Sequence, residues 1–213
     1  RNGYITLSLP RVDSESLARA GLLVSIAPRR AFSHAERTAV REFVTQGGNL
    51  IIIAGYDDAG PSRALLSDFG FAIGADTRDS QEPAPMGHFK SPYLRSQEQR
   101  VYVRFHAAWP VTCDDPAAQV IAYGKDNLPV IILRRVGAGK VVVIGDTNFA
   151  ANDNLELEDG QPFEGLRENA DFWRWFITVL RDEPAWIPPA LQGAGQGQEV
   201  PASPAEPVQE GTP

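Results

Sequence analysis

With 213 residues the chain is long enough for one substantial domain and too short for two of ordinary size. Its net charge of −7 comes without any block of lysine or arginine, which excludes the usual nucleic-acid-binding proteins because phosphate contacts require concentrated positive charge. The single cysteine, Cys113, excludes an internal disulfide and a multi-cysteine metal site.

The first half of the chain alternates predicted strands with predicted helices. Residues 4–9 alternate between apolar and polar and are expected to form a strand, whereas residues 22–27 and 49–54 are apolar runs typical of strands buried on both faces. A short helix capped by Asp13 or Ser14 is expected to run to Ala20. Strands that alternate with helices through short turns predict parallel pairing with right-handed crossovers.

Two further helices have clear boundaries in this half. Ser33 and Glu36 form a capping box, in which each side chain satisfies a free backbone N–H group at the start of a helix. Gly47 and Gly48 end that helix, because glycine adopts the left-handed conformation at low cost. The next helix begins at Pro61 and is expected to end at Gly70.

The second half of the chain contains mostly predicted strands. Residues 74–100 lack sustained periodicity and are interpreted as a long surface excursion. A glycine-containing turn at residues 136–139 predicts an antiparallel hairpin. A closing helix over residues 168–180 carries aromatic side chains on several sides, which predicts deep packing. The strands are predicted at residues 101–105, 119–123, 129–133 and 140–144.

These elements predict an α/β fold of the flavodoxin-like or Rossmann-like type. The expected architecture is a three-layer sandwich around a mostly parallel sheet, with an antiparallel hairpin at one side. The domain is expected to span residues 1–185, and residues 186–213, which are rich in proline and glycine, are expected to be a disordered tail or linker. No apolar run approaches the ~20 residues that cross a bilayer. Because the chain opens at Arg1 on a predicted strand, we expect a piece of a longer protein.

Three stretches carry a resemblance to a known family. They are residues 22–29 with the strand GGNLIIIAG that follows the next helix, the hairpin VGAGKVVVIGD, and the loop at Asn152 with the helix that opens at Glu168. Together they resemble an uncharacterised bacterial family related to class I glutamine amidotransferases, domain of unknown function 4350. The resemblance covers residues 4–182 and implies a strand and a helix before residue 1. It also implies a location beside transmembrane segments, and hence membrane association through segments outside this chain.

The catalytic machinery of an active amidotransferase is not found in the sequence. The nucleophilic cysteine should occupy the turn after residues 49–54, where this chain has Gly55-Tyr56-Asp57-Asp58-Ala59-Gly60. The histidine and glutamate partners should follow the late strand, where it has Gly145-Asp146-Thr147-Asn148. Cys113 is followed by two acidic residues, which disfavour a reactive thiolate, and lies at no strand-to-helix turn. We therefore assign no catalytic residue.

Polar side chains are nevertheless expected to converge where parallel strands end. Ligands of open α/β sheets bind at the carboxyl ends of the strands, so these side chains form a candidate ligand-binding rim. The competing interpretation is that Asp57 and Asp146 cap the turns that follow them through their carboxylate oxygens. The candidate residues are Arg29, Tyr56, Asp57, Asp58, Asp146, Asn148 and Asn152.

Three functions remain open from the sequence. The first is a non-catalytic binding or scaffolding domain for a protein partner or a small polar ligand. The second is a hydrolase that uses Asp57 and Asp146 on a sugar or an amide, and the third is a structural spacer. No metal or cofactor is expected, because the acidic loop over residues 152–160 departs from the EF-hand pattern and no phosphate-binding fingerprint occurs.

Overall fold

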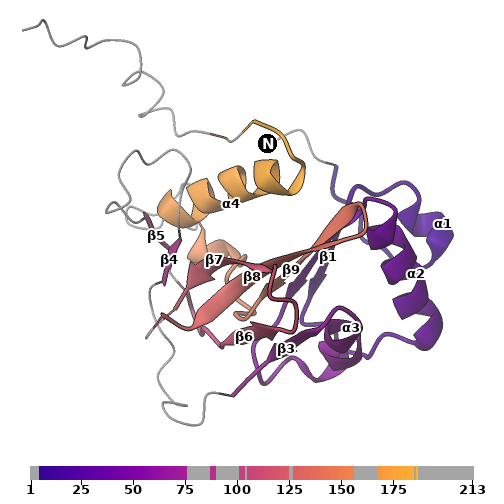
Figure 1. The fold of residues 1–213 in the computed structure, drawn as a ribbon, viewed down its shortest axis with the longest axis horizontal. Coiled ribbons are helices and arrows are strands. Elements are labelled where there is room, and N and C mark those ends of the chain that lie inside the picture. Colours follow the sequence, from indigo (N-terminus) through magenta and orange to yellow (C-terminus); the bar gives the residue numbers. More distant parts are fainter. Residues whose placement is uncertain are drawn as a thin grey trace, which may run out of the picture.

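The structure is a computed structural model that describes residues 5–75, 87–89, 101–103, 105–124, 127–155, 167–184 and 186. Within these residues a seven-stranded mixed sheet runs through the middle of the molecule (Figure 1). Across the sheet the strands are, in order, β1 (Leu22–Ile26), β2 (Asn49–Ile53), β9 (Gly139–Ile144), β8 (Pro129–Val136), β7 (Gln119–Tyr123), β4 (Gly87–Phe89) and β5 (Val101–Val103).

Helices and a small second sheet make up the rest of the described fold. The second sheet pairs β3 (Phe71–Ile73) with β6 (Val111–Cys113) in antiparallel fashion. Neither of these two strands was predicted from the sequence. The helices are α1 (Ser14–Leu17), α2 (His34–Thr45), α3 (Arg63–Asp68) and α4 (Arg167–Leu180), with the 3-10 turns η1 (Gly60–Ser62) and η3 (Asn152–Asn154).

The main sheet is parallel on one side only. β1, β2 and β9 run parallel, whereas β9–β8, β8–β7, β7–β4 and β4–β5 are antiparallel. The prediction of a flavodoxin-like or Rossmann-like sandwich with a mostly parallel sheet is therefore wrong, and the fold is α/β with a mixed sheet. Parallel neighbours need a long crossover, usually a helix. The described residues between β3 and β9 contain no α-helix, and β8 returns to β9 through a tight turn. The predicted hairpin between β8 and β9 is confirmed, with Gly137 at φ 59° in its turn.

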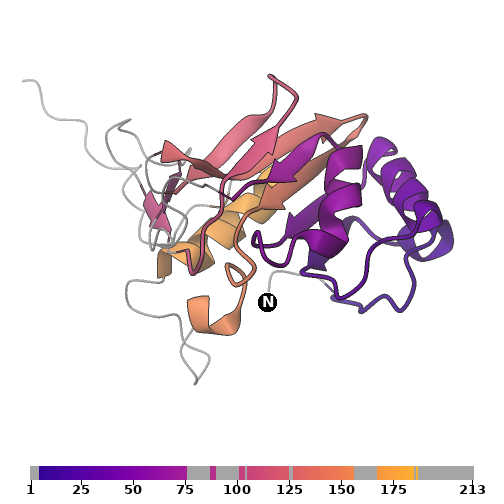
Figure 2. The same cartoon turned by 90° about the horizontal axis from the view of Figure 1, so that it is seen from below.

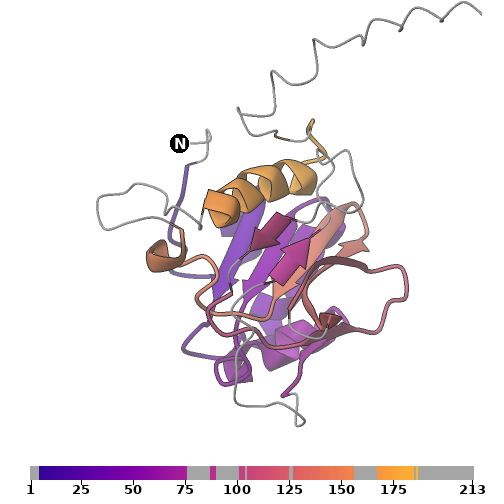
Figure 3. The same cartoon turned by 90° about the vertical axis from the view of Figure 1, so that its left-hand side faces the viewer.

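The two faces of the sheet are covered by helices from different parts of the chain. Figure 3 shows α4, in orange, on one side of the strands and α3 on the other. In Figure 2 the indigo-to-purple helices α1, α2 and α3 gather beside the parallel end of the sheet. Side chains of β2 alternate between the two cores: Leu50 and Ile52 pack with α1–α3, and Ile51 and Ile53 pack with α4. This explains the uninterrupted apolar run, because both faces of β2 are buried.

Local signals in the sequence account for the boundaries of α2. The Ser33 hydroxyl oxygen accepts the N–H of Glu36, and a Glu36 carboxylate oxygen accepts the N–H of Ser33 at 2.8 Å, which confirms the capping box. The helix ends before Gly47, whose φ is 113°. Gly48 is required for a second reason: a Cβ there would lie 2.3 Å from the ring of Phe43. The helix therefore packs directly onto the chain that leads into β2.

A buried lysine holds the C-terminal end of α4. The Lys140 Nζ donates to the carbonyl oxygens of Val179 at 3.1 Å and Leu180 at 2.7 Å, and pairs with the Asp182 carboxylate at 2.7 Å. The last carbonyl groups of a helix lack partners within the helix and carry partial negative charge, so a cation is favourable there. Lys140 in β9 thereby fixes α4 against the sheet.

The N-terminal segment differs from its prediction. Residues 5–9 form no strand, although their alternation predicted one, and Ile5 and Leu7 are 88% and 68% exposed. A strand needs a neighbour for its backbone groups, and among the described residues β1 is the edge of the sheet on that side. On β1 itself Val24 and Ile26 are 45% and 51% exposed, so the alternating pattern marks apolar faces that no described element covers.

Several other predictions concern residues outside the described ranges. The proposed surface excursion over residues 74–100 lies outside them, except for residues 74 and 75 and for β4, which is a strand. The proposed tail is described only at Trp186. In the part of the chain that the structure describes, no helix has the length and apolar character needed to cross a membrane.

Candidate functional site

The carboxyl ends of the parallel strands β2 and β9 are tied together by a chain of hydrogen bonds. The backbone N–H of Gly55, just after β2, donates to the hydroxyl oxygen of Thr147 at 2.6 Å. That hydroxyl in turn donates to the Asp58 carboxylate at 2.8 Å. The turn after β2 and the loop after β9 therefore form one rigid rim, as the parallel register of the two strands predicts. We call the residues 55–58, 109 and 146–148 the strand-end rim.

Asp146 is buried and uses its carboxylate to hold backbone. One oxygen accepts the N–H groups of His106 at 2.6 Å and Ala107 at 3.2 Å, and the other accepts the N–H of Asn148 at 3.0 Å. Burial raises the pKa of Asp146, because a charged carboxylate is disfavoured away from water, and the three N–H groups oppose that rise. Asp146 therefore joins the segment before β6 to the end of β9.

Trp109 packs closely against Gly55 and Gly145 and pairs with Tyr56. The rings of Tyr56 and Trp109 lie 5.6 Å apart between centroids at an interplanar angle of 41°, and Tyr56 is 40% exposed. A Cβ on Gly55 would lie 3.2 Å from the Trp109 indole, and one on Gly145 would lie 2.1 Å from the Trp109 carbonyl oxygen. The Trp109 N–H donates to the Gly145 carbonyl at 2.7 Å. Gly145 is thus required for the close approach of the Trp109 backbone, whereas a side chain at Gly55 would have to displace the indole by a few tenths of an ångström.

Trp109 is the residue that sequence reasoning missed at this rim. It lies between β5 and β6, in a stretch without strand or helix periodicity, and nothing local connects it to the turn after β2. The only available signal was a large aromatic residue before Pro110 in the short connection between two strands. Its position depends on the antiparallel part of the structure, of which the sequence predicted only the β8–β9 pairing.

The remaining predicted residues are exposed. Asp57 and Arg29 form no hydrogen bond or ion pair with any described residue. Asn148 contributes its backbone N–H to Asp146, and Asn152 starts η3, where its carbonyl accepts the N–H of Leu155. The structure therefore brings Tyr56, Asp58, Asp146 and Asn148 together on linked backbone. No contact within the described ranges joins Arg29 or Asn152 to them.

The turn after β2 has the geometry of a connection and not of a nucleophile elbow. Residues 56–58 form a turn that leads through Ala59 into η1 and α3. None of the three has a positive φ, so the turn holds no strained residue of the kind that exposes a nucleophile. Cys113 lies elsewhere, in β6 opposite Phe71, and packs against the α1–α3 core.

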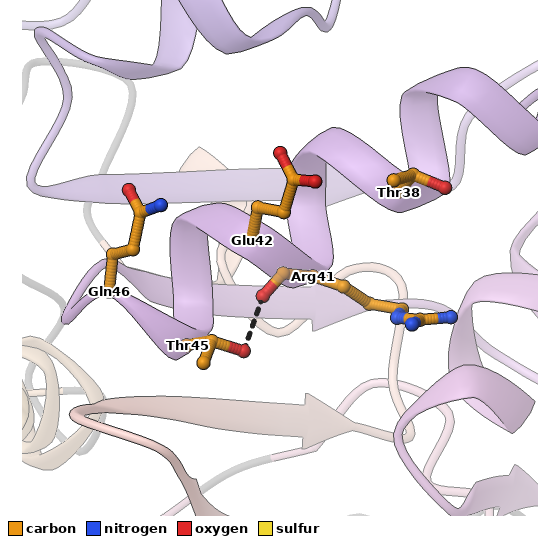
Figure 4. Close-up of a pocket in the computed structure, with 5 residues that line it drawn as sticks. All are labelled: Thr38, Arg41, Glu42, Thr45 and Gln46. Carbon is orange, nitrogen blue, oxygen red and sulfur yellow. Dashed lines mark hydrogen bonds between the residues drawn. The ribbon is translucent and has the colours of Figure 1, made fainter.

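Other candidate sites in the described residues are weaker. A hollow of about 200 Å³ lies on α2, but all of its lining residues come from that one helix and its C-cap, Gln46 (Figure 4). Its only internal hydrogen bond runs from the Thr45 hydroxyl to the Arg41 carbonyl oxygen, within the helix. Across the described ranges, no group of three or more His, Cys, Asp or Glu side chains is placed to hold a metal ion. The strand-end rim is therefore the candidate site.

Comparison with known proteins identifies a family and a fold. The profile of the Domain of unknown function (DUF4350) matches residues 5–174. No curated protein matches the sequence. Among solved structures, the mmIFT52 N-terminal domain is 17% identical, with a TM-score of 0.60 over 83% of this chain and 84% of that chain. At this identity the likeness shows a shared fold alone.

Weaker structural likenesses involve proteins of different kinds. The cytoplasmic protein STM1381 from Salmonella typhimurium LT2 is 14% identical, with a TM-score of 0.46 over 63% of each chain. A β-galactosidase from Rahnella sp. R3 is 12% identical, with a TM-score of 0.45 over 78% of this chain and 23% of that enzyme. This chain therefore spans about a quarter of the β-galactosidase, and neither likeness bears on its function.

Proposed function

The chain belongs to the DUF4350 family, whose name assigns no function, and from the geometry of the strand-end rim we propose that it is a non-catalytic binding domain. Its ligand is a protein partner or a small polar molecule that docks where β2 and β9 end. The observation that carries the proposal is that some side chains of this rim hold the backbone in place while others are exposed to solvent. Asp146 and Thr147 are occupied in holding backbone, while Tyr56 and Asp57 face solvent on the rigid turn they stabilise.

The rigidity of the rim supports binding. Side chains that recognise a partner are most effective when their backbone is already ordered, because less conformational entropy is lost on association. The Gly55–Thr147–Asp58 hydrogen bonds and the packing of Trp109 hold the turn in one arrangement. Exposed tyrosine on such a turn supplies a large contact area at low entropic cost.

The hydrolase alternative has less support. It requires Asp57 and Asp146 to face each other across a substrate, with one carboxylate free to move a proton. Both oxygens of Asp146 already accept backbone N–H groups, and the residue is buried. Its two oxygens are therefore already bonded to backbone and are not exposed to a substrate.

We extend the proposal in two respects on the resemblance described above. The domain is a relative of class I glutamine amidotransferases that recognises without reacting, in keeping with a turn of tyrosine and aspartate where the nucleophile would lie. It also works beside a membrane, through parts of a longer protein. Fractionation of the full-length protein from its own cells tests the second point, since recovery only in the supernatant at low salt would contradict it.

A binding assay with matched variants tests the main proposal. Immobilised wild-type domain is compared with Tyr56→Ala and Asp57→Asn, and with Glu42→Gln on the outer face of α2 as the control for charge and handling. We expect the rim variants to lose specific partners that the control retains. Identical capture by all four proteins would refute the rim as the binding surface. Turnover of an ester, amide or glycoside substrate by wild type, abolished in Asp57→Asn, would establish the hydrolase instead.

A further inference from the structure

We propose that the strand-end rim receives a lysine or arginine side chain of a partner protein, held over Tyr56 and Trp109 and beside the carboxylates of Asp57 and Asp58. This inference rests on the proposed function and names the chemistry of the partner. Three features of the rim support it: the aromatic pair, the placement of the two carboxylates, and the sign of the charge on the molecule.

The aromatic pair provides a face for a cation. Tyrosine and tryptophan rings attract an ammonium or guanidinium group that lies within about 6 Å of the ring centroid, because their faces carry negative potential. Tyr56 and Trp109 meet at an angle of 41° with centroids 5.6 Å apart, so they form two walls of a corner and not a flat stack. Tyr56 is 40% exposed, which leaves part of the corner open to a partner.

The carboxylates provide the matching charge. Asp57 and Asp58 follow Tyr56 directly in the same turn, and both are exposed. Asp58 accepts one hydrogen bond from Thr147 at 2.8 Å, and Asp57 has no partner among the described residues. An opposite charge beside an aromatic wall strengthens the hold on a cation, because the hydrogen-bonding and electrostatic contacts act on the same group.

Charge on the rest of the molecule favours the same partner. The chain carries a net charge of −7, which attracts a basic segment at long range. Of the two arginines that follow β1, Arg30 is neutralised by a two-pronged pair with Glu36 at 2.6 and 2.8 Å. Arg29, which also follows β1, is exposed and has no partner within the described ranges. A neutral sugar would also lie against the aromatic rings, but it would leave Asp57 without a counter-charge.

The test is a titration of the ¹⁵N-labelled protein with acetylated, amidated trilysine, followed by the backbone amide shifts of residues 55–58. Triglutamate, triglycine and cellobiose are titrated in parallel. We expect trilysine alone to shift the rim amides. Tyr56→Ala should weaken this binding about three- to tenfold and Tyr56→Phe less than twofold, because phenylalanine retains the ring.

A charge-matched pair of variants separates a specific site from general attraction. Asp57→Asn and Glu42→Gln each remove one exposed negative charge, the first at the rim and the second on α2. We expect Asp57→Asn to weaken trilysine binding about three- to fivefold and Glu42→Gln less than twofold. Equal weakening by both would overturn the inference, because binding would then follow net charge alone.

The outcomes also distinguish the inference from the proposal beneath it. Rim shifts caused by triglutamate or cellobiose, and not by trilysine, would overturn the basic partner and leave the rim as a binding surface. No shift with any of the four probes would overturn the basic partner as well. The binding assay with Tyr56→Ala then decides the proposed function separately, because it requires no assumption about the chemistry of the ligand.

Discussion

Replacement of Asp146 by asparagine separates a structural carboxylate from a functional one. The asparagine carbonyl oxygen can take over the N–H groups of His106 and Ala107, but its NH₂ group would then face the N–H of Asn148. One charge-assisted hydrogen bond is lost and one donor is left without an acceptor, a cost of about 2–4 kcal/mol. The asparagine carries no charge, so the variant avoids the cost of burying a carboxylate, and this offsets part of the loss. We expect a net loss of about 2 kcal/mol in the free energy of unfolding at pH 7.

The assay is urea unfolding followed by far-UV circular dichroism. Asp146→Ala serves as the stronger variant, because it removes all three hydrogen bonds and should cost about 4 kcal/mol. For a chain of this length each kcal/mol corresponds to roughly 2–4 °C in Tm, so thermal unfolding gives an independent measure. Both variants should keep rim binding in proportion to the fraction that remains folded.

The pH dependence has a definite sign. Because burial raises the pKa of Asp146 above 3.8, the folded protein takes up this proton more readily than the unfolded chain. The contribution of Asp146 to stability is therefore fully present below pH 3.8 and decreases as the pH rises through the folded pKa. The stability difference between wild type and Asp146→Asn should widen as the pH falls through this window. If Asp146→Asn is as stable as wild type at pH 7 yet fails to bind, Asp146 acts in recognition and the structural assignment is wrong.

Three further predictions concern the rest of the fold. Glu36→Gln should lower the free energy of unfolding by about 1 kcal/mol at pH 7. Arg30 and the Ser33 N–H lower the pKa of Glu36 from 4.5 to about 2, so the stabilisation by this carboxylate is present above pH 4.5 and is lost as the pH falls toward 2. Urea unfolding should therefore show the difference between wild type and variant vanishing in acid. Lys140→Met leaves the carbonyl oxygens of Val179 and Leu180 without a side-chain donor and should lower Tm by roughly 5 °C in a calorimetric scan. An unchanged Tm would refute the role of this lysine in holding the end of α4 against the sheet. Val24→Lys should reduce the concentration-dependent self-association of the isolated chain in light scattering, because an uncharged edge strand pairs readily with another copy. Thr45→Lys on α2 is the control. An equal reduction by both variants would show that net charge, and not the edge of β1, controls self-association.

The backbone pattern of β1 explains why this edge should associate. The N–H of Ala27 donates to Ile53 and the carbonyl of Gly21 accepts from Asn49, so odd-numbered residues of this stretch face β2. The backbone groups of Leu22, Val24 and Ile26 therefore point away from the described sheet. Residues 22–26 carry no charge, and charge is the feature by which natural edge strands avoid further pairing.

Features that depend on neighbouring residues could be predicted from the sequence. The capping box of α2, its glycine end, the buried run of β2 and the β8–β9 hairpin each follow from contacts within a few positions, and all four are found. The same reasoning failed for residues 5–9, because alternation defines the faces of a strand and does not supply the neighbour that a strand requires. It also failed for β3 and β6, whose three-residue lengths carry too little periodicity.

The candidate site divides in the same way. That polar residues would follow β2 and β9 was evident from the sequence, because strand ends and turns have local signals. Whether a carboxylate there binds a ligand or holds backbone depends on which groups reach it, and the partners of Asp146 at His106 and Ala107 lie 40 and 39 positions away along the chain. Local chemistry thus determined the elements and the composition of the rim. Only the tertiary structure decided the antiparallel pairing of β7, β4 and β5, the burial of Asp146 and the approach of Trp109 to Gly55. Long-range packing selects among the many arrangements that local propensity permits.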